Sequence, residues 1–381
     1  MPSNGAGLDQ SEDEWPIPSM WQYRSRLPVR PTARPVTLGE GKTPLVRSRL
    51  LEGIELYWKD ETRNPTGSHK DRALSVAATD ARDRGMRCMV VVSAGSTGLS
   101  NAAYAAAAGL ASIAVMSAGQ PPARIYPLAA LGSRLVAVEA DIDSLIRRVD
   151  ALNGHDGLYV ASTTQASNPV QAEAARTIAY ELVDTLGDAP DMLVVPVGGG
   201  GTLAAIHRGF LEMRSEGAST RLPRLVAVVP SRYANLAVAW RSGIATPEAF
   251  FALPEPAGGP TILNKIAHGH APDGVAALAA IRDSGGEVIA FDDAEAMAAV
   301  GEIGAADGLY FEPSTAILLP ALRELRRRGA IAPGERIVAL GCGSGFRETN
   351  VLLEPVPLRL TRARLEELPA LLAAPDPTKE R

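Results

Sequence analysis

Lys70 is the first candidate for covalent chemistry in this sequence. It follows the turn segment Asn64-Pro-Thr-Gly-Ser68 and precedes a helical pattern, so we expect it at a loop-to-helix junction. A lysine held there in a crevice loses water, gives up its proton more readily and can form a Schiff base with an aldehyde. On position alone, Lys70 could be a solvated surface charge, as most lysines are.

A run of four glycines is the second candidate. Gly198, Gly199, Gly200 and Gly201, followed by Thr202, stand between an apolar run and a helical pattern. Consecutive glycines are entropically costly unless backbone amides approach something closely, and a phosphate is the natural guest at the start of a helix. The spacing differs from Gly-x-Gly-x-x-Gly and no P-loop lysine follows, which favours a monophosphate. The alternative is a structural turn.

Two further loops are rich in small residues. Residues 93–98, Ser-Ala-Gly-Ser-Thr-Gly, precede an Ala-rich helical pattern and leave room for a ligand beside unpaired helix amides. Residues 341–345, Gly-Cys-Gly-Ser-Gly, surround Cys342. Either loop could be an ordinary turn, and Cys342 a buried inert thiol. All four loops lie just after predicted strands, where ligands of open parallel sheets bind.

The elements that carry these loops alternate between strand and helix. Predicted strands are the apolar runs at 54–59, 88–92, 112–116, 134–138, 158–160, 192–196, 225–229 and 336–340. Predicted helices include 99–108, 142–152 and 203–210. Repeated βα units imply an α/β fold with parallel sheets covered on both faces, and 381 residues predict two domains.

The two ends of the chain have their own patterns. Trp21 to Tyr23 and the Pro-rich run to Pro35 predict an extended arm, because repeated prolines forbid a helix. The tail 355–381 predicts a peripheral helix that ends in disorder.

Composition narrows the class of partner to small molecules. A net charge of −5 without a long Lys/Arg run gives no electrostatic case for nucleic acid or an anionic membrane. Two distant cysteines exclude a disulfide framework or a cysteine metal cluster, and no stretch approaches the ~18 apolar residues of a spanning helix. We therefore expect a cytoplasmic protein without a metal. The histidines show no metal-ligand spacing, although His268 and His270 could lie in a loop beside the site.

Together these segments resemble pyridoxal-phosphate (PLP) enzymes of the tryptophan synthase β fold type, and most closely the threonine synthase family, over roughly residues 20 to 350. Residues 39–45, Gly-Glu-Gly-Lys-Thr-Pro-Leu, resemble that family's opening. Residues 59–72 resemble its Lys-x-Glu-x-x-Asn-Pro-Thr-Gly-Ser-Phe-Lys-Asp-Arg segment, and similarity continues collinearly at 102–109, 168–177, 312–315 and 342–348.

This resemblance implies PLP as cofactor, bound between two parallel-sheet domains, and a homodimer. The implied divisions are an N-terminal arm 1–28, a larger PLP-binding domain 29–79 plus 166–356, a smaller α/β domain 80–165 and a tail 357–381.

The resemblance also implies roles for single residues that bind the cofactor. Lys70 corresponds to the Schiff-base lysine, and the glycine run with Thr202 to the phosphate loop. Cys342 stands where a Ser or Thr usually meets the pyridine nitrogen, although a thiol is a weak donor. His69 replaces the usual Phe, as in tryptophan-synthase-β-like proteins, where that His lies near the cofactor phosphate. Ser96 replaces the Asn expected at the cofactor's 3′ oxygen, and its hydroxyl is shorter.

Substrate contacts are expected in the loop before the Ala-rich helix and at two arginines. The loop residues are Ser93, Ala94, Gly95 and Thr97. A phosphorylated substrate would need an additional anion pocket, for which Arg72 and Arg176 are candidates; each could equally be an ion-pair partner.

The expected reaction is elimination or replacement on an activated amino acid, with the freed Lys70 as base at the α carbon. A thiol facing the pyridine nitrogen moderates the electron sink, which suits this chemistry better than transamination. Similarity over the whole chain favours conversion of O-phosphohomoserine and water to threonine and phosphate. The altered cofactor loops favour a cysteate-synthase-like β-replacement or a serine/threonine-dehydratase-like elimination. A catalytically inactive, cofactor-binding regulator is a third reading.

Overall fold

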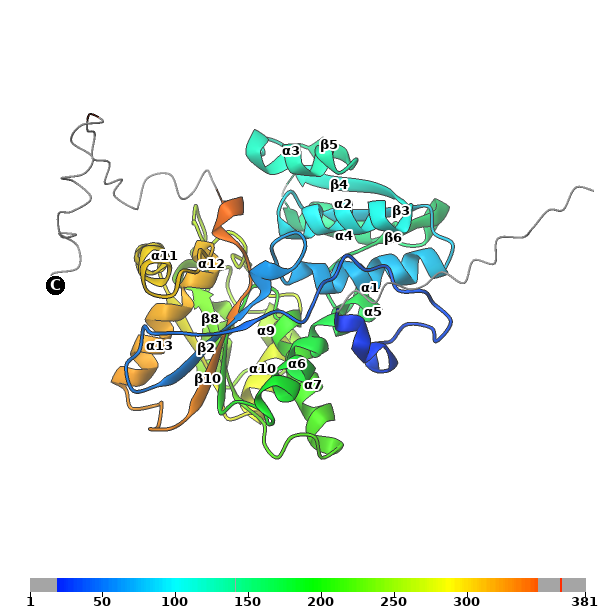
Figure 1. The fold of residues 1–381 in the computed structure, drawn as a ribbon. Helices are drawn as coiled ribbons and strands as arrows, with labels where there is room; N and C mark the ends of the chain where they lie inside the picture. Colours follow the sequence, from blue (N-terminus) through cyan, green and yellow to red (C-terminus); the bar gives the residue numbers. More distant parts are fainter. Residues whose placement is uncertain (1–18, 141, 349–363, 365–381) are drawn as a thin grey trace, which may run out of the picture.

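The strands form two sheets in the computed structural model, which describes residues 19–140, 142–348 and 364 (Figure 1). The six-stranded sheet has the order β1 (Leu45–Arg47), β2 (Glu55–Asp60), β10 (Arg336–Gly341), β7 (Met192–Pro196), β8 (Arg224–Pro230) and β9 (Glu287–Phe291). The four-stranded sheet has the order β5 (Arg134–Val138), β4 (Ala111–Ser117), β3 (Cys88–Val92) and β6 (Leu158–Val160). All neighbours in these two orders are parallel except β1 and β2.

Helices cover both faces of the small sheet because its central strand is apolar on both sides. Cys88 and Val90 of β3 pack with α4 (Ile142–Asp150), whereas Met89 and Val91 pack with α1 (Lys70–Asp83) and α2 (Ser96–Ala108). Successive residues of a strand point to opposite faces, so one continuous apolar run serves two cores. Leu128 of α3 (Pro122–Ala130) packs on β4.

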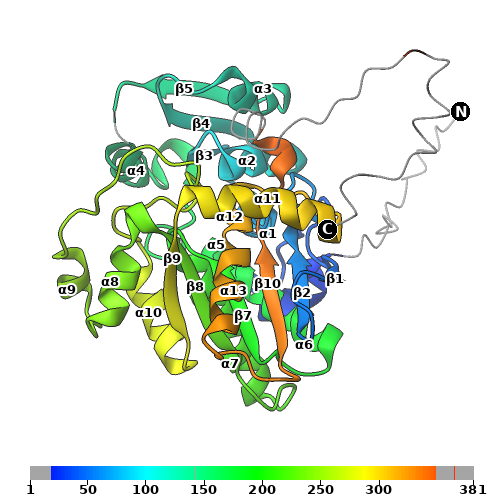
Figure 2. The same cartoon turned by 90° about the vertical axis from the view of Figure 1, so that its left-hand side faces the viewer.

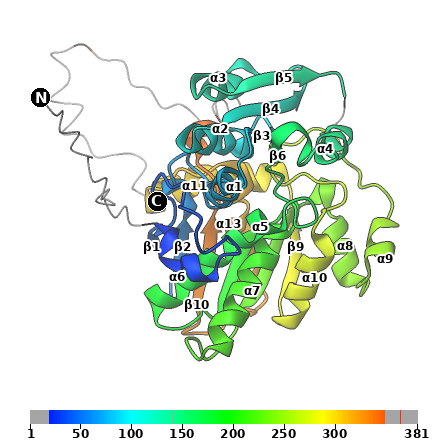
Figure 3. The ribbon, with the colours of Figure 1, turned by 90° about the vertical axis from the view of Figure 1, so that its right-hand side faces the viewer.

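The large sheet is built in the same way. Leu193 and Val195 of β7 face one core, which the residues of α6 (Arg176–Leu186), α7 (Gly201–Ser215), α8 (Asn235–Arg241) and α10 (Gly274–Asp283) complete. Met192 and Val194 face the other core, completed by α11 (Asp293–Asp307), α12 (Pro313–Ala316) and α13 (Leu318–Arg327). Figure 2 shows α11 and α13 in front of this sheet, and Figure 3 shows α6, α7 and α10 on its other side. The remaining short helices are α5 (Pro169–Ala172) and α9 (Pro247–Phe251).

The predicted α/β class and parallel sheets are confirmed, and each of the eight predicted apolar runs forms a strand. β1 and β9 were not predicted. Both lie at the edges of the large sheet, and most of their side chains are only partly buried, so neither carries a continuous buried pattern. No helix among the described residues is long and apolar enough to span a bilayer.

The extended arm is a prediction that was wrong in its first part. Residues Met20–Arg26 form a 3₁₀ helix, since no proline occurs between Pro18 and Pro28 and Ser19 caps the helix by accepting the N–H of Trp21. Trp21 Nε1 donates to Ser75 Oγ at 2.8 Å, which fixes this segment on α1. The predicted tail helix lies outside the described residues, apart from residue 364.

The division into domains stays a prediction. The strands of the small sheet lie within 88–160, and those of the large sheet lie within 45–60 and 192–341. The predicted boundary at 79/80 falls inside α1, whose Leu74 and Ala77 pack with Met89 of the small sheet.

Candidate active site

The loop before Lys70 is fastened to the loop after β10. β2 and β10 are parallel neighbours, so the chain leaves both at the same edge of the sheet. Ser68 forms a bridge with Gly343, and the His69 N–H donates to the Cys342 carbonyl at 3.0 Å. Asp71 accepts from Thr66 N–H at 2.6 Å, so the loop also folds back on its own helix. These bonds fix Lys70 as the first residue of α1.

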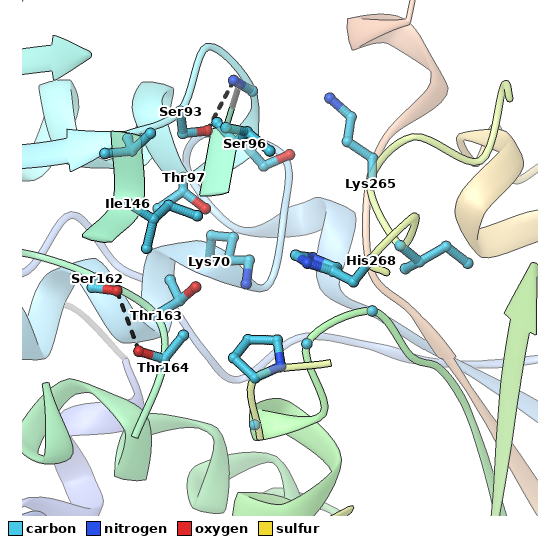
Figure 4. Close-up of a pocket in the computed structure, with 18 of the residues that line it drawn as sticks. Lys70, Ser93, Ser96, Thr97, Ile146, Ser162, Thr163, Thr164, Lys265 and His268 are labelled. Atoms are coloured by element: carbon cyan, nitrogen blue, oxygen red, sulfur yellow. Dashed lines mark hydrogen bonds between the residues drawn. The ribbon is translucent and has the colours of Figure 1, made fainter. Parts of the chain in front are cut away.

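A cavity of about 770 Å³ lies where the loops of the two sheets meet (Figure 4). Its volume is that of a small-molecule site. The predicted residues that line it are Lys70, His69, Ser93, Ala94, Gly95, Ser96, Thr97, Gly198, Gly199, Gly200, Gly201, Thr202 and Cys342. The structure therefore brings all four predicted loops to one space, with Lys70 among them.

Burial sets the protonation of the groups around Lys70. It lowers the pKa of the Lys70 ammonium, against the opposing effects of Cys342 and Asp273, and so favours a neutral, nucleophilic amine. The pKa of His69 falls to about 3 through burial and the neighbouring Lys70, so its imidazole is neutral at pH 7. Burial raises the pKa of the Cys342 thiol well above its usual value, so sulfur keeps its proton.

Close packing explains why glycines occupy this run, a reason that the sequence alone did not indicate. A Cβ on Gly198 would lie 2.9 Å from the Ile266 Cα, and one on Gly200 would lie 2.8 Å from the Asp273 carbonyl oxygen. Gly200 also has φ +91°, a left-handed conformation that disfavours other residues. The amides at the start of α7 still lie beside the cavity, and phosphate binding there stays a prediction.

Arg72 does not serve as a substrate contact, which corrects the first of the two arginine predictions. Its side chain is 1% exposed, and its guanidinium donates to both oxygens of Glu61 at 2.7 Å and to both oxygens of Glu181 at 2.6 and 2.8 Å. With Thr43 and Thr177 these acceptors engage all of its N–H groups. Arg72 therefore anchors α1 to η2 (Glu61–Arg63) and α6.

Arg176 is also engaged elsewhere. It forms ion pairs with Glu173 and Glu212 and is absent from the cavity lining. Glu173 lies in the 3₁₀ turn just before α6, and Glu212 lies in α7. Arg176 is therefore the ion-pair residue that the sequence left open as the alternative.

Several charged and hydroxyl residues of the lining were not predicted. They are Arg124, Arg147, Asp150, Ser162, Thr163, Thr164, Lys265, Asp273 and Glu312. Residues 162–164 follow the predicted strand 158–160, so the rule that finds the other loops would have found them. His268 and His270 also line the cavity, where the sequence analysis allowed for them. Lys265 lies in the segment between α9 and α10, which carries no strand pattern.

Residues 36–343 match the sequence model of a family described as "Pyridoxal-phosphate dependent enzyme". The chain belongs to this family. The resemblance to its threonine-synthase-like members is confirmed by two relatives that are similar over most of the chain. A threonine synthase of Methanosarcina acetivorans is 31% identical over 355 residues, which cover 91% of this chain and 84% of that protein. A threonine synthase of Mycobacterium leprae is 32% identical over 340 residues, which cover 88% of this chain and 90% of that protein.

Solved structures of other enzymes share the fold of this family member. That of an O-ureido-L-serine synthase superposes with a TM-score of 0.68 at 23% identity and covers 88% of this chain and 97% of its own. That of a fungal L-serine ammonia-lyase from Rhizomucor miehei gives a TM-score of 0.67 at 20% identity, with 80% and 94% covered. At these identities the likeness concerns the fold alone.

The residues of the cavity fit PLP, the cofactor of the family. Lys70 offers a desolvated amine, and the first turn of α7 offers unpaired amides for a phosphate. Asp273 lies beside Gly201, but its carboxyl accepts the Gln165 N–H, and burial raises its pKa, which weakens its repulsion of an anion. Cys342 faces the same cavity as a neutral thiol.

Proposed function

We propose that this chain converts O-phosphohomoserine and water to threonine and phosphate, using PLP held at Lys70. The observation that carries the proposal is the meeting of Lys70, the glycine run and the loop 93–97 at one cavity. Relatives named threonine synthase that match about nine-tenths of the chain support the choice of reaction.

In this proposal, each predicted loop holds one part of the cofactor. Lys70 would bind its aldehyde carbon, and the amides of Gly198 to Gly201 with the Thr202 hydroxyl would hold its phosphate, beside neutral His69. Cys342 would face the ring nitrogen, and a buried thiol that keeps its proton would leave that nitrogen largely unprotonated. Ser96 would face the 3′ oxygen.

Lys70 is also the proposed base. When bound, the cofactor supplies an electron sink for the substrate's α carbon. The amine of Lys70, whose pKa burial lowers, takes the α proton and later returns a proton to the product. The loop Ser93, Ala94, Gly95 and Thr97, at the start of α2, binds the substrate carboxylate through backbone amides and hydroxyls.

A second candidate is a specialised elimination or β-replacement, cysteate-synthase-like or serine/threonine-dehydratase-like. Two observations favour it: Ser96 replaces the expected Asn, and the two arginines once considered for a substrate phosphate lie outside the cavity lining. The substrate then is a hydroxy or another phosphorylated amino acid.

The test is product analysis with the purified, PLP-loaded protein. O-phosphohomoserine should yield threonine and phosphate in equal amounts, and O-phosphoserine and serine serve as comparison substrates. Lys70→Ala should lose both the absorbance band of lysine-bound cofactor and all turnover. If the band is unchanged in Lys70→Ala, the assignment of Lys70 is wrong. If only serine or O-phosphoserine reacts, the second candidate replaces the first.

We also propose that the enzyme acts in the cytoplasm as a homodimer, with the domain divisions given above. Family resemblance supports the dimer, and composition supports the compartment. Light scattering on the purified protein tests the dimer, and a monomer at micromolar concentration would contradict it.

A further inference from the structure

A chain of three hydroxyl groups and one carboxylate lies along the cavity wall that follows β6. Ser162 Oγ lies 3.4 Å from Thr164 Oγ1, and Thr164 Oγ1 donates to Ser167 Oγ at 2.9 Å. Ser167 Oγ in turn donates to Asp150 Oδ2. Ser162, Thr164 and Asp150 line the cavity. In Figure 4, the bond between Ser162 and Thr164 is the dashed line to the left of Lys70. We call these four side chains the hydroxyl relay.

Backbone contacts hold the relay in place. Asp150 is the last residue of α4, and the three hydroxyl residues follow β6. Asn168 Nδ2 donates to the Val160 carbonyl at 3.1 Å, and the Asn168 N–H donates to the Thr164 carbonyl at 3.0 Å, which folds the loop back on the strand. Asn153 Oδ1 accepts the Val160 N–H at 3.0 Å and so ties the turn after α4 to the same strand. Both ends of the relay are therefore fixed to β6.

The direction of these hydrogen bonds follows from the single proton that each hydroxyl carries. A carboxylate can only accept, so Ser167 gives its proton to Asp150. Thr164 must then donate to Ser167, and Ser162 must donate to Thr164. Ser162 Oγ has no proton left to offer. The relay therefore presents a hydrogen-bond acceptor to any group beside Ser162 in the cavity.

We propose that the hydroxyl relay takes up the proton of the water molecule that adds to the substrate, with Asp150 as the final acceptor. As the water oxygen bonds to the substrate carbon, one O–H bond of water breaks and its electron pair stays on oxygen. The electron pair that the carbon gives up moves into the cofactor's electron sink. The water proton passes to Ser162, and each hydroxyl passes its own proton on, so only Asp150 gains one. Asp150 is partly exposed, so bulk water can remove that proton.

Other candidate bases near this wall are already engaged. In the proposed function, on which this relay rests for its nucleophile, Lys70 handles the proton of the α carbon. Asp273 accepts the Gln165 N–H and lies beside Gly201 of the glycine run. Arg147 donates to Ser144 Oγ, which leaves the Asp150 carboxylate to the relay.

The first link of the relay, between Ser162 and Thr164, is its longest at 3.4 Å. Hydrogen bonds of this length are weak, but those of catalytic groups often shorten once a substrate is bound. Substrate binding is therefore the step that completes the relay.

Product analysis with O-phosphohomoserine and the PLP-loaded protein tests the relay. An elimination product that is not hydrated ends as 2-oxobutanoate and ammonia, so the ratio of threonine to phosphate measures the addition of water. Thr164→Val keeps the side-chain shape without the hydroxyl and should lower this ratio about tenfold or more. Asp150→Asn, whose amide is not a base, should do the same. Thr164→Ser restores a hydroxyl and should keep the wild-type ratio.

Two controls separate a proton relay from a structural role. Ser144→Ala removes a hydroxyl of α4 that bonds to Arg147 outside the relay, and it should leave the ratio unchanged. In D2O the wild-type ratio should fall, because several protons move together, whereas the ratio of Thr164→Val should respond less. An unchanged absorbance spectrum of the bound cofactor shows that each variant keeps an intact site.

The outcomes separate this relay from the proposed reaction. Threonine formation with the same ratio in wild type, Thr164→Val and Asp150→Asn upholds the reaction and overturns the relay. A wild-type protein that makes no threonine but replaces the phosphate of O-phosphoserine by a thiol overturns the reaction. The share of replacement product against pyruvate then decides the relay: a share that falls in Thr164→Val and not in Thr164→Ser upholds it, and an unchanged share overturns it. A wild-type protein that adds no nucleophile to either substrate overturns both.

Discussion

Two clusters of arginine, lysine and glutamate lie in this molecule, and they differ in how fully their charges are matched. Around Arg72, two bases and two acids each have at most 4% of their side chain exposed, and Lys59 Nζ contacts Glu181 at 2.7 Å. Around Glu348, Arg124 and Lys265 share one carboxylate and line the cavity.

The engagement of its donors separates a structural arginine from one that can bind a ligand. Every donor of Arg72 has a protein acceptor, so a ligand could bind only by breaking those bonds. At Glu348 two cations share one carboxylate, Lys265 at Oε1 and Arg124 at Oε2, and both cations line the cavity, so an anion can approach them without breaking either contact. The balance of charge and the engagement of donors therefore distinguish the two clusters, whereas residue type alone does not.

The largest expected effect is on stability, at the matched cluster. Arg72→Gln should lower the free energy of unfolding by about 3–5 kcal/mol, because it leaves Glu61 and Glu181 buried without their main partner. Urea unfolding measures this. Arg176→Gln is the control: this arginine is 21% exposed, and its loss should cost about 1 kcal/mol or less. Equal losses in the two variants would contradict the structural role of Arg72.

A comparison of two glutamates sharpens the contrast. Glu61→Gln should lower the free energy of unfolding by about 2–4 kcal/mol, since Arg72 then lies buried with half its countercharge. Glu348→Gln should lower the free energy of unfolding by less, because water in the cavity can solvate the two cations that lose their countercharge. Arg124 is 25% exposed and Lys265 20% exposed. Thermal unfolding of the PLP-loaded variants gives the ranking, and a larger loss for Glu348→Gln would make that cluster the structural one.

The fold was largely predictable from the sequence because its central strands are buried on both faces. Such strands appear as continuous apolar runs, as at 88–92 and 192–196. Edge strands such as β9, in which only Val288 is fully buried, lack that signal. The 3₁₀ helix at Met20–Arg26 escaped prediction because the prolines that follow it dominated the local pattern.

The site was predictable where it follows strands and not where it depends on long-range pairing. Lys70, Ser96, Gly198 and Cys342 were found because their loops leave parallel strands at the same edge. Arg72 was misassigned because its partner Glu181 lies 109 residues further along the chain. Lys265 comes from a segment without regular structure, so only the fold brings it to the cavity wall.

Glu312, on which the charges of Lys265, Glu348 and Arg124 act, provides a test of charge in the Glu348 cluster by its pH dependence. Its pKa rises in the fold from 4.5 to about 7, so the folded state holds this proton more tightly than the unfolded state. Its contribution to stability is therefore favourable near pH 4.5 and is lost as pH rises through 7. Glu312→Gln lacks this dependence, so the variant should gain up to about 3 kcal/mol over wild type between pH 5 and pH 8.

Urea unfolding of both PLP-loaded proteins at several pH values measures that difference. A difference that does not change with pH would mean that the surrounding cations hold Glu312 ionised throughout, and its charge would then be matched in the same way as those of the Arg72 cluster.

The smallest expected effect is at an exposed ion pair, which sets the baseline for both clusters. Arg323 and Glu302 contact each other on the surface with 45% and 42% of their side chains exposed. Water and salt screen such a pair, so Arg323→Ala should cost about 0–1 kcal/mol, and added salt should reduce even that. The measurement is urea unfolding at low and at high salt. A loss as large as that of Arg72→Gln would mean that burial and donor matching do not separate the ion pairs of this protein, and the contrast between the Arg72 and Glu348 clusters would lose its physical basis.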